Sequence, residues 1–398
     1  MHRLSGARRS YDWGSTTAMF DFLDTSPDGD PFAELWLGAH PTGPATVEGP
    51  YGPEPLNHVL AEDPTQHLGE AVASTFGQLP YLVKLLAPSR PLSMQVHPNR
   101  KMAAAGYRDE ERRGVPLDDP RRSFKDEYNK PEMVYAITHF EGLVGFRPQE
   151  EVALLLQAVG GPLSAAFTAL RLAPEEQGMR AALEQLLDLG LEDIREVLKT
   201  TGQLESHPDT VIRAACSTVN ELAHLYPGDI GAVISLMLNR VRLQPGQLVF
   251  LADGVPHAYL GGFGLEIMGN SDNVLRLGLT SKHIDIPSML QALDFGSSGF
   301  EVETAPSYQV THVFEPPTPE YALSITRPHL ASGSTAVLPG AGPRVLVCLG
   351  GQVRAATGTD QQGAVLTRGA SLFVPAGEGE ISASGCGVLA QAFVPAIT

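Results

Sequence analysis

The stretch PLSMQVHP, residues 91–98, places polar side chains at every second position. Ser93, Gln95 and His97 alternate with Met94 and Val96, which is the periodicity of a β-strand with one polar and one apolar face. Such a polar face either contacts water or lines a pocket, and the stretch by itself is consistent with both. Side chains elsewhere in the chain decide between the two.

Composition limits the kind of protein. The chain has 398 residues, of which 43% are hydrophobic and 18% are charged, so it can form two or three domains with real cores. A formal net charge of −17 argues against a nucleic-acid partner and against attraction to an acidic membrane surface. The three cysteines are far apart, no apolar stretch is long enough to span a membrane, and no secretory signal is visible. We expect a cytoplasmic monomer with reduced cysteines and no nucleic-acid or membrane partner.

The chain divides into segments of different periodicity. Short β segments fill residues 1–148, apart from a charged stretch at 108–130 that we expect to be a surface loop. Helical spacing follows over residues 149–226, and Asp229 is placed to cap one more helix ending near Asn239. Strands resume, and beyond residue 306 only β signals occur. The fold class is therefore mainly β with an α-helical insertion. The predicted domains are 1–148 with 227–305, the insertion 149–226, and a second β domain 306–398.

Two more stretches contain residue types that bind metals. Glu132 opens the apolar strand of NKPEMVYAIT, where a buried acid is costly unless it is paired or bound to a metal. His257, in DGVPHAYLGG, follows an apolar strand, and a neutral imidazole is the commonest metal ligand in proteins. Each alone is equally consistent with an exposed strand end or a structural histidine. Together with the polar face they form a set of four metal-ligand candidates, Gln95, His97, Glu132 and His257. These donors suit a catalytic divalent ion, and zinc is favoured over manganese or iron(II).

Two cations occur inside apolar strands. Arg276, in NVLRLG, is either an edge-strand arginine with its head in water or a guanidinium directed at an oxyanion or phosphate. Lys84, in YLVKLL, has leucine and valine neighbours on both sides and requires a buried anionic partner.

A set of short motifs, in this order, resembles the type I phosphomannose isomerases of the cupin superfamily. The match runs from about residue 10 to residue 295, includes the helical insertion, and contains these motifs: YDWGS, AELWLGAHP, LSMQVHP, KPEMVYA, GFRP, PHAYL and NSDNVLRLGLTSKHID. The resemblance implies a cupin (jelly-roll) catalytic domain, and RGASLFVPAG near the C-terminus is similar to a cupin strand pair. It also implies that Gln95, His97, Glu132 and His257 bind one Zn²⁺.

The activity that this resemblance implies is the interconversion of mannose 6-phosphate and fructose 6-phosphate through a cis-enediol. The residues with suitable chemistry for catalysis are Arg276, Glu266, Lys130 and Tyr259. Those for binding the sugar phosphate are Ser93, Lys84, Lys282, Asp272 and Trp13, and Asp12 beside Trp13 is placed to help close the sugar pocket. Family members commonly have Asp after the QxHP motif, where this chain has Asn99; because this side chain is not a metal ligand, we expect little effect.

Two alternatives stay open at this stage. The same fold could isomerise a different sugar, phosphorylated or free, or it could be a non-catalytic sugar-binding cupin. The intact set of four metal ligands together with Arg276 and Lys130 argues against the non-catalytic protein, which has no need of all six.

Overall fold

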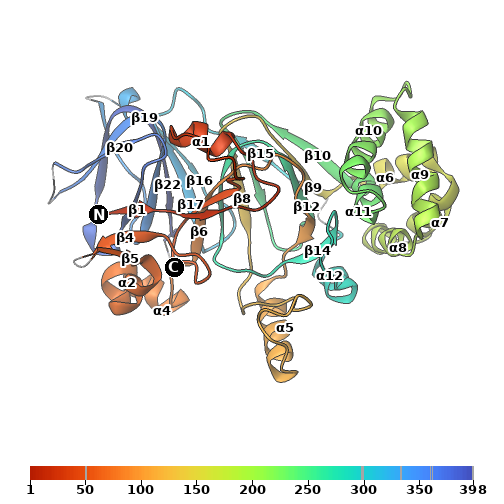
Figure 1. The fold of residues 1–398 in the computed structure, drawn as a ribbon, viewed down its shortest axis with the longest axis horizontal. Coiled ribbons are helices and arrows are strands. Elements are labelled where there is room, and N and C mark those ends of the chain that lie inside the picture. The colour runs from red at the N-terminus through yellow and green to blue at the C-terminus, as the bar shows by residue number, and fades with distance from the viewer. Residues whose placement is uncertain (50–51, 297–299, 332–333, 359, 361, 397–398) are drawn as a thin grey trace.

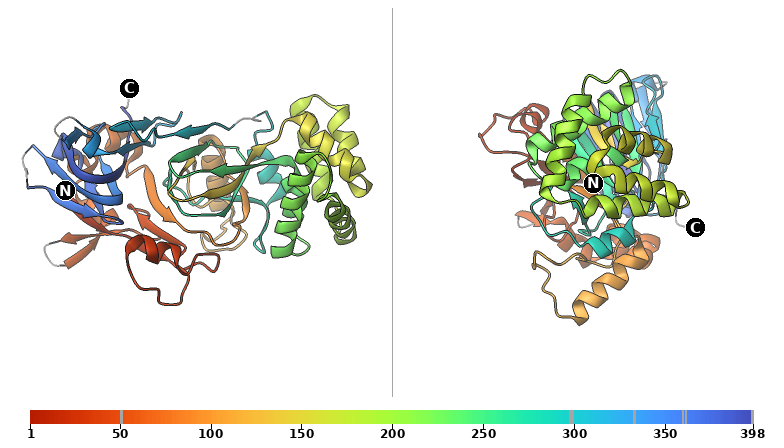
Figure 2. Two further views of the ribbon diagram at one scale, coloured as in Figure 1. Left: turned by 90° about the horizontal axis from the view of Figure 1, so that it is seen from above. Right: turned by 90° about the vertical axis from the view of Figure 1, so that its right-hand side faces the viewer.

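The computed structural model describes residues 1–49, 52–296, 300–331, 334–358, 360 and 362–396. Three parts lie in a row along its longest axis: a β part that holds both chain ends, a central pair of sheets, and a group of helices (Figure 1). The view from above in Figure 2 likewise shows the helices at the opposite end of the molecule from the two termini. The fold class, mainly β with an α-helical insertion, is confirmed.

The central part consists of two antiparallel sheets. The five-stranded sheet has the order β10 (Leu238–Leu243), β9 (Phe140–Phe146), β12 (His257–Gly261), β7 (Met94–Val96) and β14 (Leu275–Gly278). The seven-stranded sheet has the order β15 (Val302–Thr304), β11 (Gln247–Leu251), β8 (Glu132–Ala136), β13 (Gly264–Gly269), β6 (Tyr81–Leu86), β3 (Glu34–Leu37) and β2 (Ala7–Arg9). Apolar side chains of both sheets form one core between them, as in a jelly roll.

The inner strands of the seven-stranded sheet are buried on both faces. In β6, Val83 and Leu85 pack outward against the C-terminal sheet, while Leu86 faces the core between the central sheets. Every residue of the strand is buried for this reason, including Lys84. In β7, Met94 and Val96 are completely buried against the helical part. The alternation in PLSMQVHP therefore separates an apolar face directed at the helices from a polar face directed between the sheets.

Helices fill the segment between β9 and β10, as the periodicity predicted. They are α6 (Gln149–Val159), α7 (Ser164–Leu172), α8 (Glu175–Leu187), α9 (Leu191–Leu204) and α10 (Thr210–Leu225). Asp229 caps the short α11 (Ile230–Ile234) by accepting the N–H of Gly231. The prediction that this helix extends to Asn239 was wrong, because the chain enters β10 at Leu238 and pairs with β9.

The C-terminal strands form a large antiparallel sheet together with strands from the N-terminus. Its order is β16 (Thr311–Phe314), β17 (Ala322–Thr326), β22 (Ile381–Phe393), β19 (Arg344–Thr357), β21 (Ser371–Val374), β1 (His2–Ser5), β4 (Thr46–Gly49) and β5 (Gly52–Pro55). Beside it, β18 (Thr335–Val337) pairs with β22 and β20 (Ala364–Thr367) with β19. The first strand of the chain thus pairs with the C-terminal part, and the division into domains stays a prediction.

The remaining helices lie outside these layers: α1 (Ala18–Leu23), α2 (Leu56–Glu62), α3 (Pro64–Leu68), α4 (Glu70–Phe76), α5 (Arg100–Arg112) and α12 (Ile286–Ala292). In the described ranges, none of the helices is both long enough and apolar enough to cross a membrane.

The surface loop predicted at residues 108–130 is wrong in its first part. Helix α5 continues to Arg112, with Asn99 at its N-cap accepting the N–H of Met102. The buried carboxylate of Glu110 then accepts the N–H groups of Ser123 and Phe124, which folds the following segment back onto the helix. The high charge concealed the helix because most of its charged side chains are exposed to water.

Candidate active site

Three buried side chains converge between the two central sheets. Nε2 of His97 lies 3.1 Å from Oε1 of Glu132, and Nε2 of His257 lies 3.3 Å from Oε2 of the same carboxylate. None of the three is more than 2% exposed. Their ligand atoms lie within 4.8 Å of one another, close enough to share one metal ion.

Backbone carbonyls fix both imidazole rings. Nδ1 of His97 lies 2.6 Å from the carbonyl oxygen of Asn273, and Nδ1 of His257 lies 2.9 Å from that of Val255. A carbonyl only accepts hydrogen bonds, so each Nδ1 is the protonated nitrogen and each Nε2 directs a lone pair at Glu132. Burial, and then the charge of Lys130, lower the pKa of His97 to about 4, so this ring is neutral at pH 7.

One row of side chains crosses the five-stranded sheet beside this cluster. Strand pairing places both His257 and Arg276 directly opposite Gln95, one on each side of it. Side chains of directly opposite residues lie on the same face of a sheet. Gln95 reaches the histidine, with Nε2 of its amide 3.2 Å from Nε2 of His257. Burial lowers the pKa of Arg276, and its Nε is buried without a hydrogen-bond partner.

This donor set fits a divalent metal ion. The Nε2 lone pairs and the carboxylate of Glu132 are all acceptors, so they repel one another unless a cation lies between them. Nε2 of His97 is correspondingly buried with no hydrogen-bond donor. The amide of Gln95, turned by half a rotation, presents its oxygen at the same place. Two imidazoles, a carboxylate and an amide oxygen with no thiolate are typical of a catalytic zinc site.

Two further groups contact Glu132. The ammonium of Lys130 lies 3.2 Å from Oε1, and the hydroxyl of Tyr259 donates to Oε2 at 3.0 Å. Burial opposes ionisation of this carboxyl group, but the charge of Lys130 holds the pKa of Glu132 well below its usual value. Glu132 therefore stays an anion inside the protein.

A second group of charges faces the same space from the seven-stranded sheet. Nζ of Lys84 lies 2.9 Å from Oε2 of Glu266 and 3.9 Å from Oε1 of Glu34. The anionic partner that the sequence required for Lys84 is thus present. Burial raises the pKa of Glu266, although Lys84 opposes this, and the two carboxylates raise the pKa of Lys84 against the effect of its own burial.

A pocket of about 240 Å³ opens at the end of the polar face of β7. Among its lining residues are Trp13, Ser93 and Lys282, three of the predicted substrate-binding residues, together with Asp12 and Arg90. Partial burial, and then the charge of Arg276, lower the pKa of Lys282. Lys84 and Asp272, which were also predicted to bind substrate, do not line it. Lys84 lies between the sheets, and the carboxylate of Asp272 is 3.5 Å from Nε2 of His40.

Comparison with known proteins shows the family of this chain. The catalytic-domain model of type I phosphomannose isomerase matches residues 1–149. Mannose-6-phosphate isomerase of Salmonella typhimurium is 36% identical over 99% of both chains, and the human enzyme is 31% identical over 94% of this chain and 93% of its own. This chain belongs to the type I phosphomannose isomerase family. A zinc-bound crystal structure of a mannose 6-phosphate isomerase superposes with a TM-score of 0.89, 33% identity and 99% coverage of both chains.

The site of this phosphomannose isomerase includes residues that the sequence did not single out. Glu34 contacts Lys84 and accepts a hydrogen bond of 2.6 Å from Nε1 of Trp36. Their alternation in ELWL is the signal that was available, because it puts Glu34 and Trp36 on one face.

Asn273 is the second residue that was missed. Its carbonyl orients His97, while its side-chain amide accepts the N–H of Lys125 and donates to the carbonyl of Tyr128. These bonds tie one metal-ligand candidate to the segment that leads into Glu132. The motif NSDN was visible, but nothing in its spacing revealed these partners.

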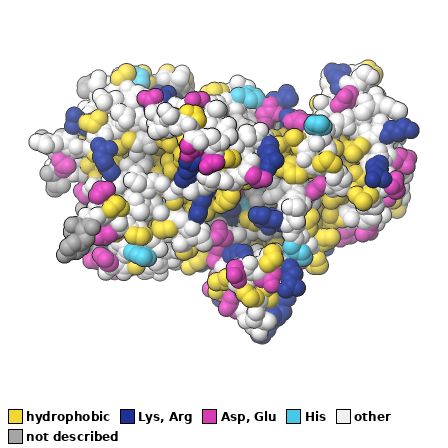
Figure 3. All heavy atoms as spheres, in the orientation of Figure 1, with side chains coloured by type: hydrophobic (Ala, Val, Ile, Leu, Met, Phe, Trp, Pro, Cys, Tyr) yellow, Lys and Arg dark blue, Asp and Glu magenta, His cyan; other side chains and the backbone are white. Residues whose placement is uncertain are grey.

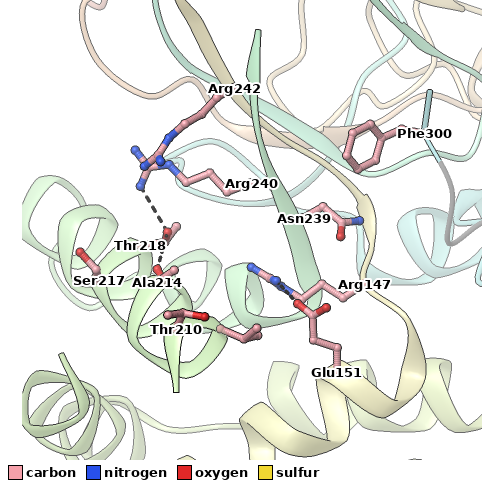
Figure 4. A pocket seen from close by; sticks show the side chains of 11 residues that line it. Arg147, Glu151, Thr210, Ala214, Ser217, Thr218, Asn239, Arg240, Arg242 and Phe300 are labelled. Carbon is pink, nitrogen blue, oxygen red and sulfur yellow. Dashed lines mark hydrogen bonds and ion pairs between the residues drawn. The ribbon is translucent and has the colours of Figure 1, made fainter. Parts of the chain in front are cut away.

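A larger cleft, of about 530 Å³, lies between α10 and β10 and is lined by three arginines (Figure 4). Each of them already has an acidic partner: Arg147 pairs with Glu151, Arg240 with Glu141 and Glu221, and Arg242 with Glu141. None of the candidate metal ligands lines this cleft. On the face drawn in Figure 3, basic side chains are interspersed with acidic ones. The predicted metal ligands and three of the predicted substrate-binding residues thus lie between the sheets and at the smaller pocket, away from this cleft.

Proposed function

We propose that this chain catalyses the reversible isomerisation of mannose 6-phosphate to fructose 6-phosphate through a cis-enediol. The observation that carries the proposal is the convergence of buried His97, Glu132 and His257 with half-buried Gln95, beside a pocket lined by Ser93 and Lys282. Full-length relatives named mannose-6-phosphate isomerase agree with it.

We propose Zn²⁺ as the metal, held by Gln95, His97, Glu132 and His257. A relative of high structural similarity is described as zinc-bound. When bound, the metal polarises the oxygens on C1 and C2 of the sugar and lowers the cost of removing a proton from the adjacent carbon.

The phosphate of the substrate is assigned to Ser93 and Lys282. Ser93 precedes Gln95 by two residues on the same face, so the two are about 7 Å apart along the strand. This is the order of the distance between the reacting carbons of a hexose 6-phosphate and its phosphorus. Trp13, in the same pocket, is assigned to cover the sugar, and the 41%-exposed carboxylate of Asp272 to contact a hydroxyl group. Lys84 is proposed to neutralise the charge of Glu266 rather than to bind the phosphate.

The proton transfers are assigned to groups of this chain. Glu266 takes the proton from C2 of the aldose, and the carbonyl oxygen on C1 gains a proton, which gives the enediol. Glu266 then returns its proton to C1 while the hydroxyl on C2 loses its own, and the ketose forms. Burial raises the pKa of Glu266, which strengthens it as a base. Arg276 stabilises negative charge on the enediolate, and Lys130 and Tyr259 keep Glu132 in place and exchange protons with the sugar oxygens.

A coupled assay tests the substrate. Mannose 6-phosphate and free mannose are compared at equal concentration with the same metal-loaded enzyme, and we expect turnover of the phosphorylated sugar only. Preference for free mannose would remove the phosphate roles of Ser93 and Lys282.

We also propose that the enzyme acts as a monomer in the cytoplasm. Sedimentation at assay concentrations tests the first point, and fractionation of the source cells tests the second.

A further inference from the structure

The pocket that holds Ser93 and Lys282 contains one more cation, Arg90, and one anion, Asp12. The two form an ion pair with each other, Nη2 of Arg90 donating to Oδ2 of Asp12. By contrast, the described contacts give the ammonium of Lys282 no ion-pair partner. The guanidinium of Arg90 is thus already paired with Asp12, in the same pocket in which a substrate phosphate is expected.

Backbone contacts hold the segments of Arg90 and Asp12 side by side. Gly14 forms a β-bridge with Pro88, and the N–H and hydroxyl of Ser89 both donate to the carbonyl of Trp13 at 3.0 Å. A side chain at Gly14 would meet the backbone of Ala33 at 2.6 Å, so the close packing of this segment against Ala33 requires glycine.

The chain after Arg90 is fixed as well. The carbonyl of Pro91 accepts a hydrogen bond of 2.6 Å from the hydroxyl of Tyr226, and the N–H of Leu92 donates to the carbonyl of Tyr259 at 2.8 Å. The backbone of Arg90 is therefore anchored on both sides, and what can exchange partners is its side chain.

The ion pair itself is weak. The side chain of Arg90 is 46% exposed and that of Asp12 is 83% exposed, and pairs this exposed contribute little to stability because water and salt screen them. A phosphate dianion carries more charge than a carboxylate and offers three oxygens, to which a guanidinium can bind through two N–H groups. With Lys282 in the same pocket, a phosphate can displace Asp12 from Arg90.

We propose that Arg90 is a further phosphate-binding residue and that Asp12 is its internal competitor, which sets the affinity of the pocket for the phosphate of the substrate. This inference rests on the proposed function, because it deepens the assignment of the same pocket. In the free enzyme Arg90 is paired with Asp12. In the complex, Arg90 binds the phosphate, and the side chain of Asp12 rotates away from it toward the solvent.

The test compares Arg90→Ala, Arg90→Gln, Asp12→Asn and the double variant Arg90→Ala/Asp12→Asn. Two quantities are measured: the KM for mannose 6-phosphate, and the Kd of inorganic phosphate by calorimetry, which needs no turnover. Removal of Arg90 should raise both about tenfold, the size expected for hydrogen bonds to a charged group. Asp12→Asn should lower the KM and the Kd by up to about fivefold. The same substitution should have a smaller effect in the Arg90→Ala protein, where the competition is absent.

The matched control is the exposed pair Arg171 and Glu150, which lies on the helical insertion away from the pocket. Arg171→Ala and Glu150→Gln should leave both quantities at the wild-type value. An unchanged Kd for phosphate in both Arg90 variants would overturn the inference, and so would weaker binding in Asp12→Asn, since the pair would then only support the fold. Circular dichroism confirms that each variant is folded, and Asp12→Asn tests the competition even if both Arg90 variants fail to fold.

Failure of the proposed function gives a different result. Wild-type enzyme would then not convert mannose 6-phosphate, whereas the calorimetric comparison of the variants would still decide whether Arg90 binds phosphate.

Discussion

Lys84 and Glu266 are direct partners across β6 and β13, and Nζ of the lysine lies 2.9 Å from Oε2 of the glutamate with both residues buried. Both side chains lie on the inner face of the sheet, where Lys84 is 6% and Glu266 is 3% exposed, so neither charge is solvated by bulk water. The pair therefore holds two charges at fixed positions beside the candidate metal ligands, and it explains a lysine in the otherwise apolar stretch YLVKLL.

Loss of one partner of this pair should destabilise the enzyme. We expect Lys84→Met to lower the free energy of unfolding by about 3 kcal/mol, because Glu266 is left as an uncompensated buried charge. Urea unfolding measures it. Lys101→Met, at an exposed position of α5, should change stability by less than about 0.5 kcal/mol. Equal effects of the two substitutions would contradict the structural role of the pair.

Metal removal should abolish activity and lower stability together. A ligand present at about a thousand times its Kd stabilises the native state by about 4 kcal/mol, so chelation by EDTA should lower Tm and added zinc should restore it. In His257→Ala the Tm should no longer respond to zinc, whereas His139→Ala, at an exposed histidine, should respond as wild type does. Full activity of metal-free enzyme would refute the metal site.

Arg276→Ala should lose turnover and stay folded. The guanidinium has a buried Nε without a partner, so the fold gains little from it, while an enediolate would lose its charge-stabilising donor. We expect kcat to fall by about 10²- to 10³-fold with an unchanged far-ultraviolet spectrum. Arg242→Ala, in the larger cleft, is the control and should keep wild-type kcat. A similar loss of turnover in this variant would contradict the prediction, because it would show that the larger cleft takes part in catalysis.

Asp253 should make stability depend on pH. Burial raises the pKa of this carboxyl group to about 6, above its value in the unfolded chain. The folded state therefore binds the extra proton between about pH 4 and 6, and the stability contributed by Asp253 falls as pH rises through this window. Asp253→Asn should raise stability by about 1 kcal/mol at pH 8, a value discounted for partial exposure, and change it little at pH 4. The acceptor for the amide of Asn129 is kept, since the new side chain retains a carbonyl oxygen. An equal gain at both pH values would show that charge is not the cause.

Asn99 should be replaceable by the residue common in the family. Asn99→Asp keeps the acceptor for the N–H of Met102, so activity and stability should both be close to wild type. Asn99→Ala removes the cap of α5 and should cost about 1 kcal/mol, measured by thermal unfolding. A large loss of activity in Asn99→Asp would show that the charge next to His97 matters.

Much of this protein follows from local sequence. The two-residue alternation in PLSMQVHP, the helical spacing at 149–226 and the donor types of Gln95, His97, Glu132 and His257 depend only on neighbours along the chain. These patterns predicted the fold class, the helical insertion and the residues that converge. They failed at α5, where the charged side chains hide a helix whose decisive contacts, those of Glu110, reach residues thirteen and fourteen positions away.

Only the tertiary structure decided which residues far apart in the sequence contact each other. The partner of Lys84 lies on another strand, the carbonyl that orients His97 belongs to Asn273, and β1 pairs with a strand near the opposite end of the chain. Asp12 and Arg90 are likewise joined by the packing of two segments far apart in sequence. Strand register and long-range pairing set these contacts, and no local periodicity encodes them, because the period of a strand says which face a side chain is on but not what lies across from it.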